Sequence, residues 1–468
     1  MQFPILNGIY TDEAGEFRVQ FPRNLVPVVL DNGLAAGFLR PAEGLALLGT
    51  GPGFDRGGIN WNGRHFRVMG SKLIEIDVFG AVTTIGDVED NGKPVSFDYS
   101  FDYLAVASNK KLWLYNGTLA QVTDPDLRDC LDVVWVDGYF MSTDGESLVV
   151  GELNDPFDIG TLRYASSEVD PDPVEAVLKL RNEVYAVNRY TIEVFQNIGG
   201  TGFPFQRING GQIRRGAVGT HACCVFEDEF IAFVGGGRNE APAVWIGANG
   251  SSKKVSTREV DKLLAGIGEA GLKDIVLEER TDKGHKFLLI HLPGQTLVYD
   301  FDASQVAQTP VWHTLSSAVS GDGVYRARNF VYVFDRWHFG DPTSFNFGYL
   351  DDESGHHYGQ KVGWDFSTKV LYNEAKGLIV QQLELVGITG RTEVGVDPEI
   401  SCRYTQDGRS WSQPRYISSG KTGETRKRLV WFRQGAFRNY RGFRFTGDSS
   451  ARLTFARLEL EGEPLMYG

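Results

Sequence analysis

Long apolar runs are missing from this sequence of 468 residues. No stretch of about 18 consecutive apolar residues occurs, although a membrane-spanning helix needs at least that many. The N-terminal segment MQFPILNGIYTDE also lacks the basic residues with which a secretory signal begins. We therefore expect no membrane span and no cleavable signal, and we expect a soluble folded chain.

Cysteine and methionine are scarce, with four residues of each. The cysteines are Cys130, Cys223, Cys224 and Cys402, and their spacing matches no zinc-binding pattern. Cys223 and Cys224 are neighbours within an apolar strand. A free cysteine often serves as a small buried hydrophobic residue. We expect that role here, in a reducing compartment, rather than a metal site.

Helical periodicity is nearly absent. One exception is the segment STREVDKLLAGIGEAG, which starts at Ser256 and presents a short apolar face of Val260, Leu263 and Leu264. Ser256 and Glu259 have the spacing of a capping box, so we predict that a helix begins there. The remaining composition, with 56 glycines and 12% aromatic residues, favours pleated β structure.

What the chain has instead is a repeat of two apolar strands joined by a tight polar turn, as in HFRVMGSKLIEI and YLAVASNKKLWLY. Successive turns lie 36 to 58 residues apart. A diffuse period of about 40–50 residues built from strands indicates a β-propeller. The seven turns lie near Ser71, Asn109, Gly145, Arg189, Gly236, Gly294 and Pro342. The sequence therefore predicts an all-β fold with a propeller of six or seven blades, and seven is favoured.

Three regions follow from the pattern. Residues 1–56 contain many Pro, Gly and Asn positions and no evident hairpin, so we expect an extended lead-in that donates a strand to close the ring. Residues 57–355 form the propeller. A Gly-rich charged loop follows, and residues 371–465 then show longer strands in which apolar and polar residues alternate. This alternation predicts a separate β-sandwich-like domain.

The net charge also differs between the propeller region and the C-terminal region. The whole chain carries −13, residues 1–400 carry −20, and residues 401–460 carry +9. Within the basic module, arginines and lysines alternate with aromatic residues, a pattern found in some nucleic-acid-binding surfaces. In a strand with one buried face, the same alternation places the aromatics inside and the cations outside. We favour this second interpretation, with the cations facing another subunit, a partner or solvent. The candidate interface residues are Arg426, Lys427, Arg428, Arg433, Arg438, Arg441 and Arg444.

Catalytic patterns are lacking. No Gly-x-Ser-x-Gly elbow occurs, the eight histidines match no triad spacing, and the Gly-rich segments do not lead from a strand into a helix. The run TQDGRSWSQP resembles the Asp-box of sialidases, but Asp407 and Gly408 are adjacent, as in an ordinary hairpin. His356 and His357 follow three acidic residues in the loop after the propeller, without a fixed ligand spacing, so a hydrated loop is favoured over a metal site. We expect no enzyme activity, no catalytic residues, no metal and no cofactor.

The order of these pieces resembles one family from end to end: the tail hub, or packaged-DNA stabilisation protein, of short-tailed phages that bear tailspikes. The resemblance includes the lead-in FPRNLVPVVLDNGLAAGFLRPAEGL and the segments FRVMGSKLIEI, YFMSTDG and TIEVF. It is closest in FLLIHLPGQTLVYD, which is followed by TPVWHTL and GVYRARNFVY, and it continues through YTQDGRSW to KRLVWFRQGAFRNYRGFRF.

The resemblance implies a structural function. Such proteins form a homohexameric ring below the portal and its head-to-tail adaptor, continue the DNA channel and retain the packaged genome. They also seat the tail needle and the tailspikes. The resemblance further implies that genomic DNA passes through without sequence-specific binding. It implies a location in the virion tail, with assembly in the host cytoplasm.

Two other classes of function remain open. A propeller can serve as a binding scaffold for cellular partners, and gel filtration as a monomer would favour that class over a ring. A propeller glycosidase needs paired carboxylates or an arginine cluster facing one central cavity. Turnover of fluorogenic glycosides would reveal that activity.

Overall fold

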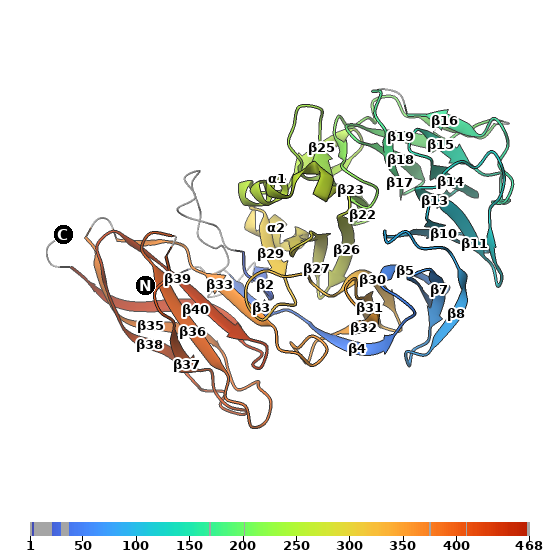
Figure 1. Ribbon diagram of the computed structural model, residues 1–468. Helices are drawn as coiled ribbons and strands as arrows, with labels where there is room; N and C mark the ends of the chain where they lie inside the picture. Colours follow the sequence, from blue (N-terminus) through green and yellow to red (C-terminus); the bar gives the residue numbers. More distant parts are fainter. Residues whose placement is uncertain are drawn as a thin grey trace.

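The computed structural model describes residues 2–3, 21–29, 37–167, 170–200, 202–373, 376–408 and 410–465. Its described residues form nine β-sheets, of which seven are arranged as a ring and two form a sandwich at one end of the molecule (Figure 1). The fold is mostly β, with two helices within the described ranges.

The ring is a propeller of seven antiparallel sheets, here called blades 1 to 7 in chain order. Blade 1 comprises β5 (Asp55–Trp61), β6 (Arg64–Met69), β7 (Lys72–Ile76) and β8 (Val82–Asp87). Blade 2 comprises β9 (Ser96–Tyr99), β10 (Leu104–Ser108), β11 (Lys111–Tyr115) and β12 (Leu119–Gln121). Blade 3 comprises β13 (Asp132–Val136), β14 (Tyr139–Thr143), β15 (Ser147–Val150) and β16 (Tyr164–Ser166). Blade 4 comprises β17 (Val174–Leu180), β18 (Glu183–Asn188), β19 (Ile192–Asn197) and β20 (Phe205–Arg207).

The other three blades complete the ring. Blade 5 comprises β21 (Gly216–Ala217), β22 (Cys223–Phe226), β23 (Phe230–Gly236), β24 (Ala243–Ala248) and β25 (Ser251–Lys254). Blade 6 comprises β26 (Val276–Asp282), β27 (His285–His291), β28 (Thr296–Asp300) and β29 (Val311–Leu315). Blade 7 comprises β30 (Arg328–Val333), β31 (Arg336–Gly340), β32 (Asn346–Asp351) and β4 (Gly44–Thr50). Each of the seven turns predicted from sequence joins two paired strands of one blade, so the hairpin count is confirmed.

Blade 7 takes its outermost strand from the N-terminal part of the chain. β4 pairs antiparallel with β32, with Gly44 opposite Asp351 and Thr50 opposite Asn346. The expectation that the lead-in donates a strand to close the ring is therefore confirmed. Because β4 precedes β5 directly, one short segment ties blade 7 to blade 1.

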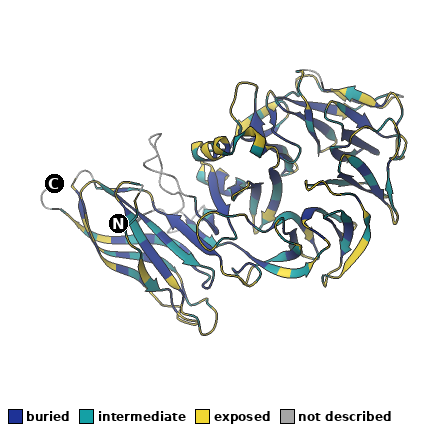
Figure 2. Cartoon of the chain, viewed as in Figure 1, coloured by how far each residue is buried: buried dark blue, intermediate teal, exposed yellow. Residues whose placement is uncertain are grey.

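Apolar clusters between neighbouring blades stabilise the ring. Middle strands such as β10 are buried on both faces, because each blade packs against one neighbour on each side (Figure 2). Phe66 of blade 1 and Val106 of blade 2 share one such cluster. The cluster between blades 7 and 1 is small, with Phe347 and three residues of blade 1 as its buried members.

The closing seam between blades 1 and 7 holds a buried ion pair beside this small cluster. Arg67 Nε donates to Asp55 Oδ1 at 2.8 Å, and both side chains are inaccessible to solvent. Asn329 of blade 7 donates to the other oxygen of Asp55 at 2.7 Å, and its carbonyl accepts from Arg67. Gly340 leaves room for this arrangement, since a Cβ there would lie 2.0 Å from Asp55 Cγ. The ring is thus closed largely by polar contacts.

The sandwich consists of two sheets that enclose one aromatic core. The first sheet has the order β2 (Leu25–Val29), β3 (Gly37–Pro41), β40 (Thr454–Pro464), β35 (Leu378–Ile388) and β38 (Leu429–Phe437), with β1 (Gln2–Phe3) also paired to β40. The second has the order β33 (Gly363–Ser367), β39 (Tyr440–Asp448), β36 (Glu399–Thr405) and β37 (Arg415–Ser418), with β34 (Leu371–Tyr372) also paired to β39. Trp364, Phe366, Trp431, Phe445 and Phe455 pack together between the sheets.

The N-terminal segment is more structured than the sequence indicated. β2 and β3 form an antiparallel hairpin, with Leu25 opposite Pro41, and β3 joins the sandwich sheet beside β40. The expectation of a lead-in without a hairpin is wrong. Pro, Gly and Asn obscured the two strands, whose partner lies more than 400 residues later in the chain. Residues 4–20 of the lead-in and residues 30–36 lie outside the described residues.

Polar contacts around residues 23 and 24 fix the sandwich against the propeller. Asn24 Nδ2 donates to the carbonyls of Ser316 and Gly363 at 2.8 Å each, and its Oδ1 accepts from the amide of Ser316. Arg23 pairs with Asp365 at 2.5 Å and donates to the carbonyl of Gly321. Both side chains are buried. The segment before β2 therefore connects blade 6, the linker after it and the sandwich.

The two helices both lie beside blades 5 and 6. α1 (Arg258–Leu272) is the predicted helix, but its N-cap is Thr257, and no side chain caps its first turn. The predicted capping box is wrong, because Ser256 Oγ instead donates to Asp261 and accepts from the amide of Val244. α2 (Phe301–Ala307) follows β28 and was not predicted, although Asp300 caps it by accepting from the amide of Ala303.

Candidate interaction surface

The basic residues singled out from the sequence separate into two groups. Arg426, Lys427, Arg428, Arg433 and Arg438 are exposed, whereas Arg441 is buried and Arg444 is partly buried. All seven lie on or next to β38 and β39. The exposed group occupies β38 and its two ends, so one edge of the sandwich presents most of the free positive charge.

Arg441 stabilises the inside of the sandwich. Its Nη1 and Nη2 donate to the carbonyls of Gln434 and Ala436 at 2.6 and 2.8 Å, and its guanidinium lies 4.2 Å from the ring of Tyr404. Burial lowers the pKa of Arg441. Including this arginine among residues that face a partner is therefore wrong. The alternation of arginines and aromatics could not reveal that one cation lies on the inner side.

Arg444 belongs to the junction of the two parts. Its Nη2 lies 2.8 Å from Asp365 Oδ2, and Asp365 also pairs with Arg23 through its other oxygen. Two arginines thus share one buried carboxylate where the sandwich meets the propeller. Asp365 lies on β33 of the same sandwich sheet as Arg444, so Arg444 holds the carboxylate that Arg23 uses at the junction. A partner that approached Arg444 would have to displace Asp365.

Arg428 is exposed but has an acidic partner. It forms two hydrogen bonds with Glu384 of β35, at 2.8 and 2.6 Å. Hydrogen bonding to Glu384 raises the pKa of Arg428, and the same bonds lower the pKa of Glu384. No ion pair is found for Arg426, Lys427, Arg433 or Arg438 among the described residues. These four carry the uncompensated positive charge of the edge.

A groove of about 920 Å³ lies on the outer face of the sandwich beside this edge. It is formed by β35, β38 and β40, and its apolar part is Phe432 with Ile379, both exposed. Arg433 and Glu461 supply the charge at its border. An apolar surface with a charged rim is the usual anatomy of a protein–protein contact.

Sequence alternation had placed Phe432 in the core, and the structure places it outside. The physical reason is that Phe432 directly follows the buried Trp431, and successive residues of a strand face opposite sides. A bulge follows in β38, where the pairing shifts between Gln382, opposite Phe432, and Val380, opposite Gly435. Arg433 and Gly435 both have positive φ there, at 54° and 79°. The bulge changes the period only after Phe432, so the available sequence signal for Phe432 was that two aromatic residues are adjacent in one strand.

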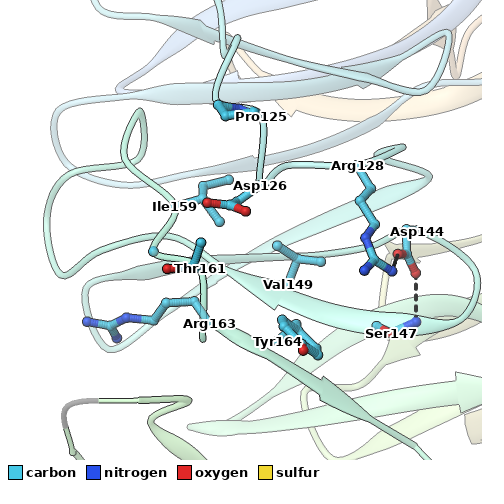
Figure 3. A pocket seen from close by; sticks show the side chains of 11 residues that line it. Pro125, Asp126, Arg128, Asp144, Ser147, Val149, Ile159, Thr161, Arg163 and Tyr164 are labelled. Atoms are coloured by element: carbon cyan, nitrogen blue, oxygen red, sulfur yellow. Dashed lines mark hydrogen bonds and ion pairs between the residues drawn. The ribbon is translucent and has the colours of Figure 1, made fainter.

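A second charged surface lies on blade 3, far from the sandwich (Figure 1). Residues 121–172 contain 13 acidic and 2 basic residues, which accounts for more than half of the −20 of residues 1–400. A small cavity of about 70 Å³ opens beside it, lined by Arg128, Asp144 and Tyr164 among others (Figure 3). Asp144 accepts from the amide of Ser147 and from Arg128, so it serves the turn of the hairpin.

The loop after the propeller differs from its prediction in one respect. His356 and His357 are buried rather than hydrated, and His357 Nδ1 lies 2.7 Å from Ser317 Oγ. Burial, with smaller contributions from Arg326 and His356, lowers the pKa of His357 to about 3. Among the described residues, no group of three or more His, Cys, Asp or Glu side chains has the geometry of a metal site. Neither helix within the described ranges is long and apolar enough to cross a membrane.

A seven-bladed propeller closed by an N-terminal strand, with a sandwich built from both ends of the chain, defines a two-part β protein with oppositely charged surfaces. The model of the family described as "Bacteriophage P22 Gp10, beta-propeller" matches residues 1–355, and "Bacteriophage P22 Gp10, beta-sandwich" matches residues 363–463. The first match alone covers most of the sequence. The chain therefore belongs to the P22 Gp10 family of phage tail hub and stabilisation proteins, and the family resemblance seen in the sequence is confirmed.

Individual proteins are similar to this chain either in sequence over its whole length or in structure over part of it. The tail hub protein gp10 of Salmonella phage P22 is 24% identical over 485 residues, which covers 99% of each chain. Among solved structures, the WD40 domain of Neurospora crassa Pan2 has 12% identity and a TM-score of 0.41, covering 65% of this chain and 94% of that domain. The N-terminal domain of Nup159 has 8% identity and a TM-score of 0.42, covering 70% of this chain and 98% of that one. These two scores are too low to carry an argument about function.

Proposed function

We propose that this chain forms the hub ring of a short phage tail. In this proposal six copies lie below the portal and its adaptor, continue the DNA channel, retain the packaged genome and seat the tail needle and tailspikes. The observation that carries it is the full-length relationship to a tail hub protein, together with the match of both parts of the chain to the P22 Gp10 family.

The charge distribution supports this function on physical grounds. A strongly acidic propeller repels phosphate, so a ring of such subunits lets DNA pass without binding it tightly. Opposite charges on two parts of one subunit favour a defined orientation between neighbours more than they add affinity. Residues 1–400 carry −20 and residues 401–460 carry +9, so the subunit has this polarity.

Different regions of the chain have different roles in this function. Residues 57–355 form most of the propeller and residues 371–465 most of the sandwich, to which β33 (Gly363–Ser367) also belongs, while residues 1–56 contribute strands to both. Catalysis, a metal and a cofactor have no part in this function. The exposed basic edge of the sandwich faces another subunit or a tail partner, now with Arg441 and Arg444 assigned to internal contacts.

Particles made without this chain provide the main test. They should package their genomes and then lose them, so nuclease digestion should degrade the DNA of particles purified after packaging. The isolated chain should bind duplex DNA only weakly at physiological salt. Particles that keep their DNA without the chain, or tight and salt-resistant binding by the isolated chain, would contradict the hub function.

Reversing Arg426, Lys427 and Arg428 to Glu tests the interface assignment. Exposed charge pairs are worth about 0–1 kcal/mol each, so three changes are needed for a visible loss of assembly. The variant should melt at the same temperature as the unchanged chain but assemble less well. Normal assembly at both low and high salt would show that this edge meets no partner.

A further inference from the structure

The two charged surfaces lie at opposite ends of the subunit. The sandwich occupies one end of the molecule, and blades 3 and 4 lie at the other end (Figure 1). A contact between two different surfaces of identical subunits is heterologous, and repeating it produces a closed ring or a filament. Complementary surfaces at opposite ends are therefore the arrangement from which a ring can be built.

The first surface is the sandwich groove beside β38. Its apolar part is exposed, with Phe432 at 62% and Ile379 at 38% of full accessibility. Arg433 lines the groove, and Arg438 lines an adjoining hollow of about 570 Å³ at the end of the same strand. Neither arginine has an ion pair among the described residues. The groove thus offers apolar area bordered by Arg433 and by the carboxylate of Glu461, and Arg438 adds a second cation without an ion pair at the end of the same strand.

The second surface is the rim of blade 3, formed by the β13–β14 turn, the loop from 151 to 163 and the start of β16. Its apolar residues are unusually exposed, with Leu162 at 73%, Tyr164 at 55% and Leu153 at 53%. The exposed carboxylates Asp155 and Asp158 lie in the same loop.

The carboxylates of this rim also lack cationic partners. No ion pair is found for Asp155, Asp158 or Asp137 in the described part of the chain, whereas Glu152 nearby is paired with Arg163. Asp155 accepts from the amide of Phe157, and Asp137 from Asn197. The rim therefore combines exposed apolar residues with an excess of free carboxylates, whereas the edge along β38 combines exposed apolar residues with an excess of free cations beside Glu461.

We propose that the sandwich groove of one copy receives the blade 3 rim of the next copy. In this contact Phe432 and Ile379 lie against Leu162 and Tyr164, while the free cations of β38 approach the free carboxylates of the rim. The occupant is a second copy of this chain, because both halves of a complementary pair are present on every subunit and neither is satisfied within it. The inference rests on the proposed hub function, to which it adds the surfaces that join neighbours.

Reciprocal charge reversal tests the contact. One variant, Arg433→Glu with Arg438→Glu, carries two acidic surfaces. The other, Asp155→Lys with Asp158→Lys, carries two basic ones. Each alone should lower the titre of complemented particles about 100-fold, because like charges then meet at every junction. Co-expression of the two should restore the titre to within about tenfold of the unchanged chain, because a ring of alternating copies pairs opposite charges at every junction.

Matched controls separate this effect from a general change of surface charge. The combination Asp102→Lys with Lys262→Glu reverses two exposed charges outside both surfaces and should leave the titre unchanged. All variants should keep the melting temperature of the unchanged chain. Should each reversed variant support particles as well as the unchanged chain, or should co-expression fail to raise the titre, the contact is wrong.

Chemical cross-linking of two introduced cysteines tests the same contact without depending on particle function. Phe432→Cys and Leu162→Cys in one chain should give a ladder of covalent multimers with a short bis-maleimide. Each single change should give none beyond the background from the native thiols, which are mostly buried. A ladder in a chain that does not support genome retention would uphold the contact and contradict the hub function. Genome retention by a double-cysteine chain that stays monomeric on denaturing gels would uphold the hub function and contradict the contact.

Discussion

The propeller and the sandwich are built by opposite rules. Each blade of the propeller uses strands that follow one another in the chain, and blade 7 alone among the seven takes in a strand from elsewhere within the described residues. The first sheet of the sandwich joins β2 and β3 from the start of the chain to β35, β38 and β40 from its end. Local pairing leaves a repeat in the sequence, whereas pairing between the two ends leaves none.

The two parts also differ in their titratable groups. All eight histidines lie between residues 65 and 357, so the sandwich strands after that point contain none. The propeller carries most of the acid, and the sandwich most of the excess base. Solution conditions should therefore act on the two parts separately.

The largest effect is expected where the ring closes. Arg67→Ala should lower the free energy of unfolding of the propeller by about 3–5 kcal/mol, because it leaves the buried carboxylate of Asp55 without its cation. Urea unfolding followed by hydrogen exchange of blades 1 and 7 would measure the loss. The sandwich should keep its protection.

The control for this change lies on the same strand. Arg64→Ala removes an arginine from β6 whose partner, Glu75, is also accessible to solvent. A surface pair of this kind contributes about 0–1 kcal/mol, so this variant should unfold almost like the unchanged chain. Equal losses for the two variants would mean that the closing seam has no special energetic role.

A smaller loss is expected at the junction. Asn24→Ala removes three hydrogen bonds and leaves buried backbone groups of Ser316 and Gly363 unpaired, which should cost about 3 kcal/mol. Calorimetry should then resolve separate transitions for the two parts. Asn62→Ala is the matched control, because Asn62 has nearly the same φ of 54° but lies in an exposed turn. A single transition in Asn24→Ala would indicate that other contacts hold the parts together.

Acid should weaken the propeller before the sandwich. Burial lowers the pKa of His313 and of His357 to about 3, below the unfolded value, so unfolding takes up protons as the pH falls below 6.5. Burial raises the pKa of Asp132 to about 6, which opposes this trend over part of the same range. Burial also lowers the pKa of His221 and of His338 to about 4, so both act in the same direction as His313. The net loss from pH 7 to pH 5 should therefore exceed about 2 kcal/mol.

Hydrogen exchange at pH 7 and pH 5, corrected for the intrinsic exchange rate, would show whether the loss is confined to the propeller. His313→Gln should reduce the pH dependence by removing one of the groups responsible. Equal weakening of the sandwich, which has no histidine on its C-terminal strands, would contradict the assignment.

The smallest effect is expected at Phe432. Phe432→Ser should change the stability of the sandwich by less than about 0.5 kcal/mol, because the ring is exposed in the isolated subunit. The adjacent Trp431 is buried in the core, and Trp431→Ser should cost about 3–5 kcal/mol. Chemical unfolding of the two variants compares neighbouring residues on opposite sides of one bulged strand.

Sequence reasoning recovered the propeller well. The seven hairpins, the strand donated by the lead-in and the helix after β25 could be inferred, because each depends on residues close together in the chain. It did not find the β2–β3 hairpin, whose neighbour β40 is distant in sequence. It also missed α2, whose seven residues are too few to show a helical period.

The candidate interface was only partly predictable. The basic edge was visible in the composition, but the expectation of aromatics inside and cations outside failed at two positions. Phe432 directly follows the buried Trp431, so the two rings cannot face the same side of β38. Arg441 lies on β39 and turns inward to the carbonyls of Gln434 and Ala436. The negative charge of blade 3 could likewise be predicted by counting the acidic residues in the sequence. The exposed Leu162 and Tyr164 of this blade carried no such signal, since exposure depends on how the loop from 151 to 163 folds over the blade.

The position of β40 at the end of the chain has a consequence for synthesis on the ribosome. β40 pairs with β1, β3 and β35, so these earlier strands wait for one that is translated much later. The blades can form in order as they leave the exit tunnel, but the first sheet of the sandwich is completed only after β40 has emerged, more than 400 residues after β3. A prematurely terminated product that lacks β40 leaves the β2–β3 hairpin without its neighbour. Such a product exposes unpaired strand edges, and the cell's quality control can recognise it as incomplete.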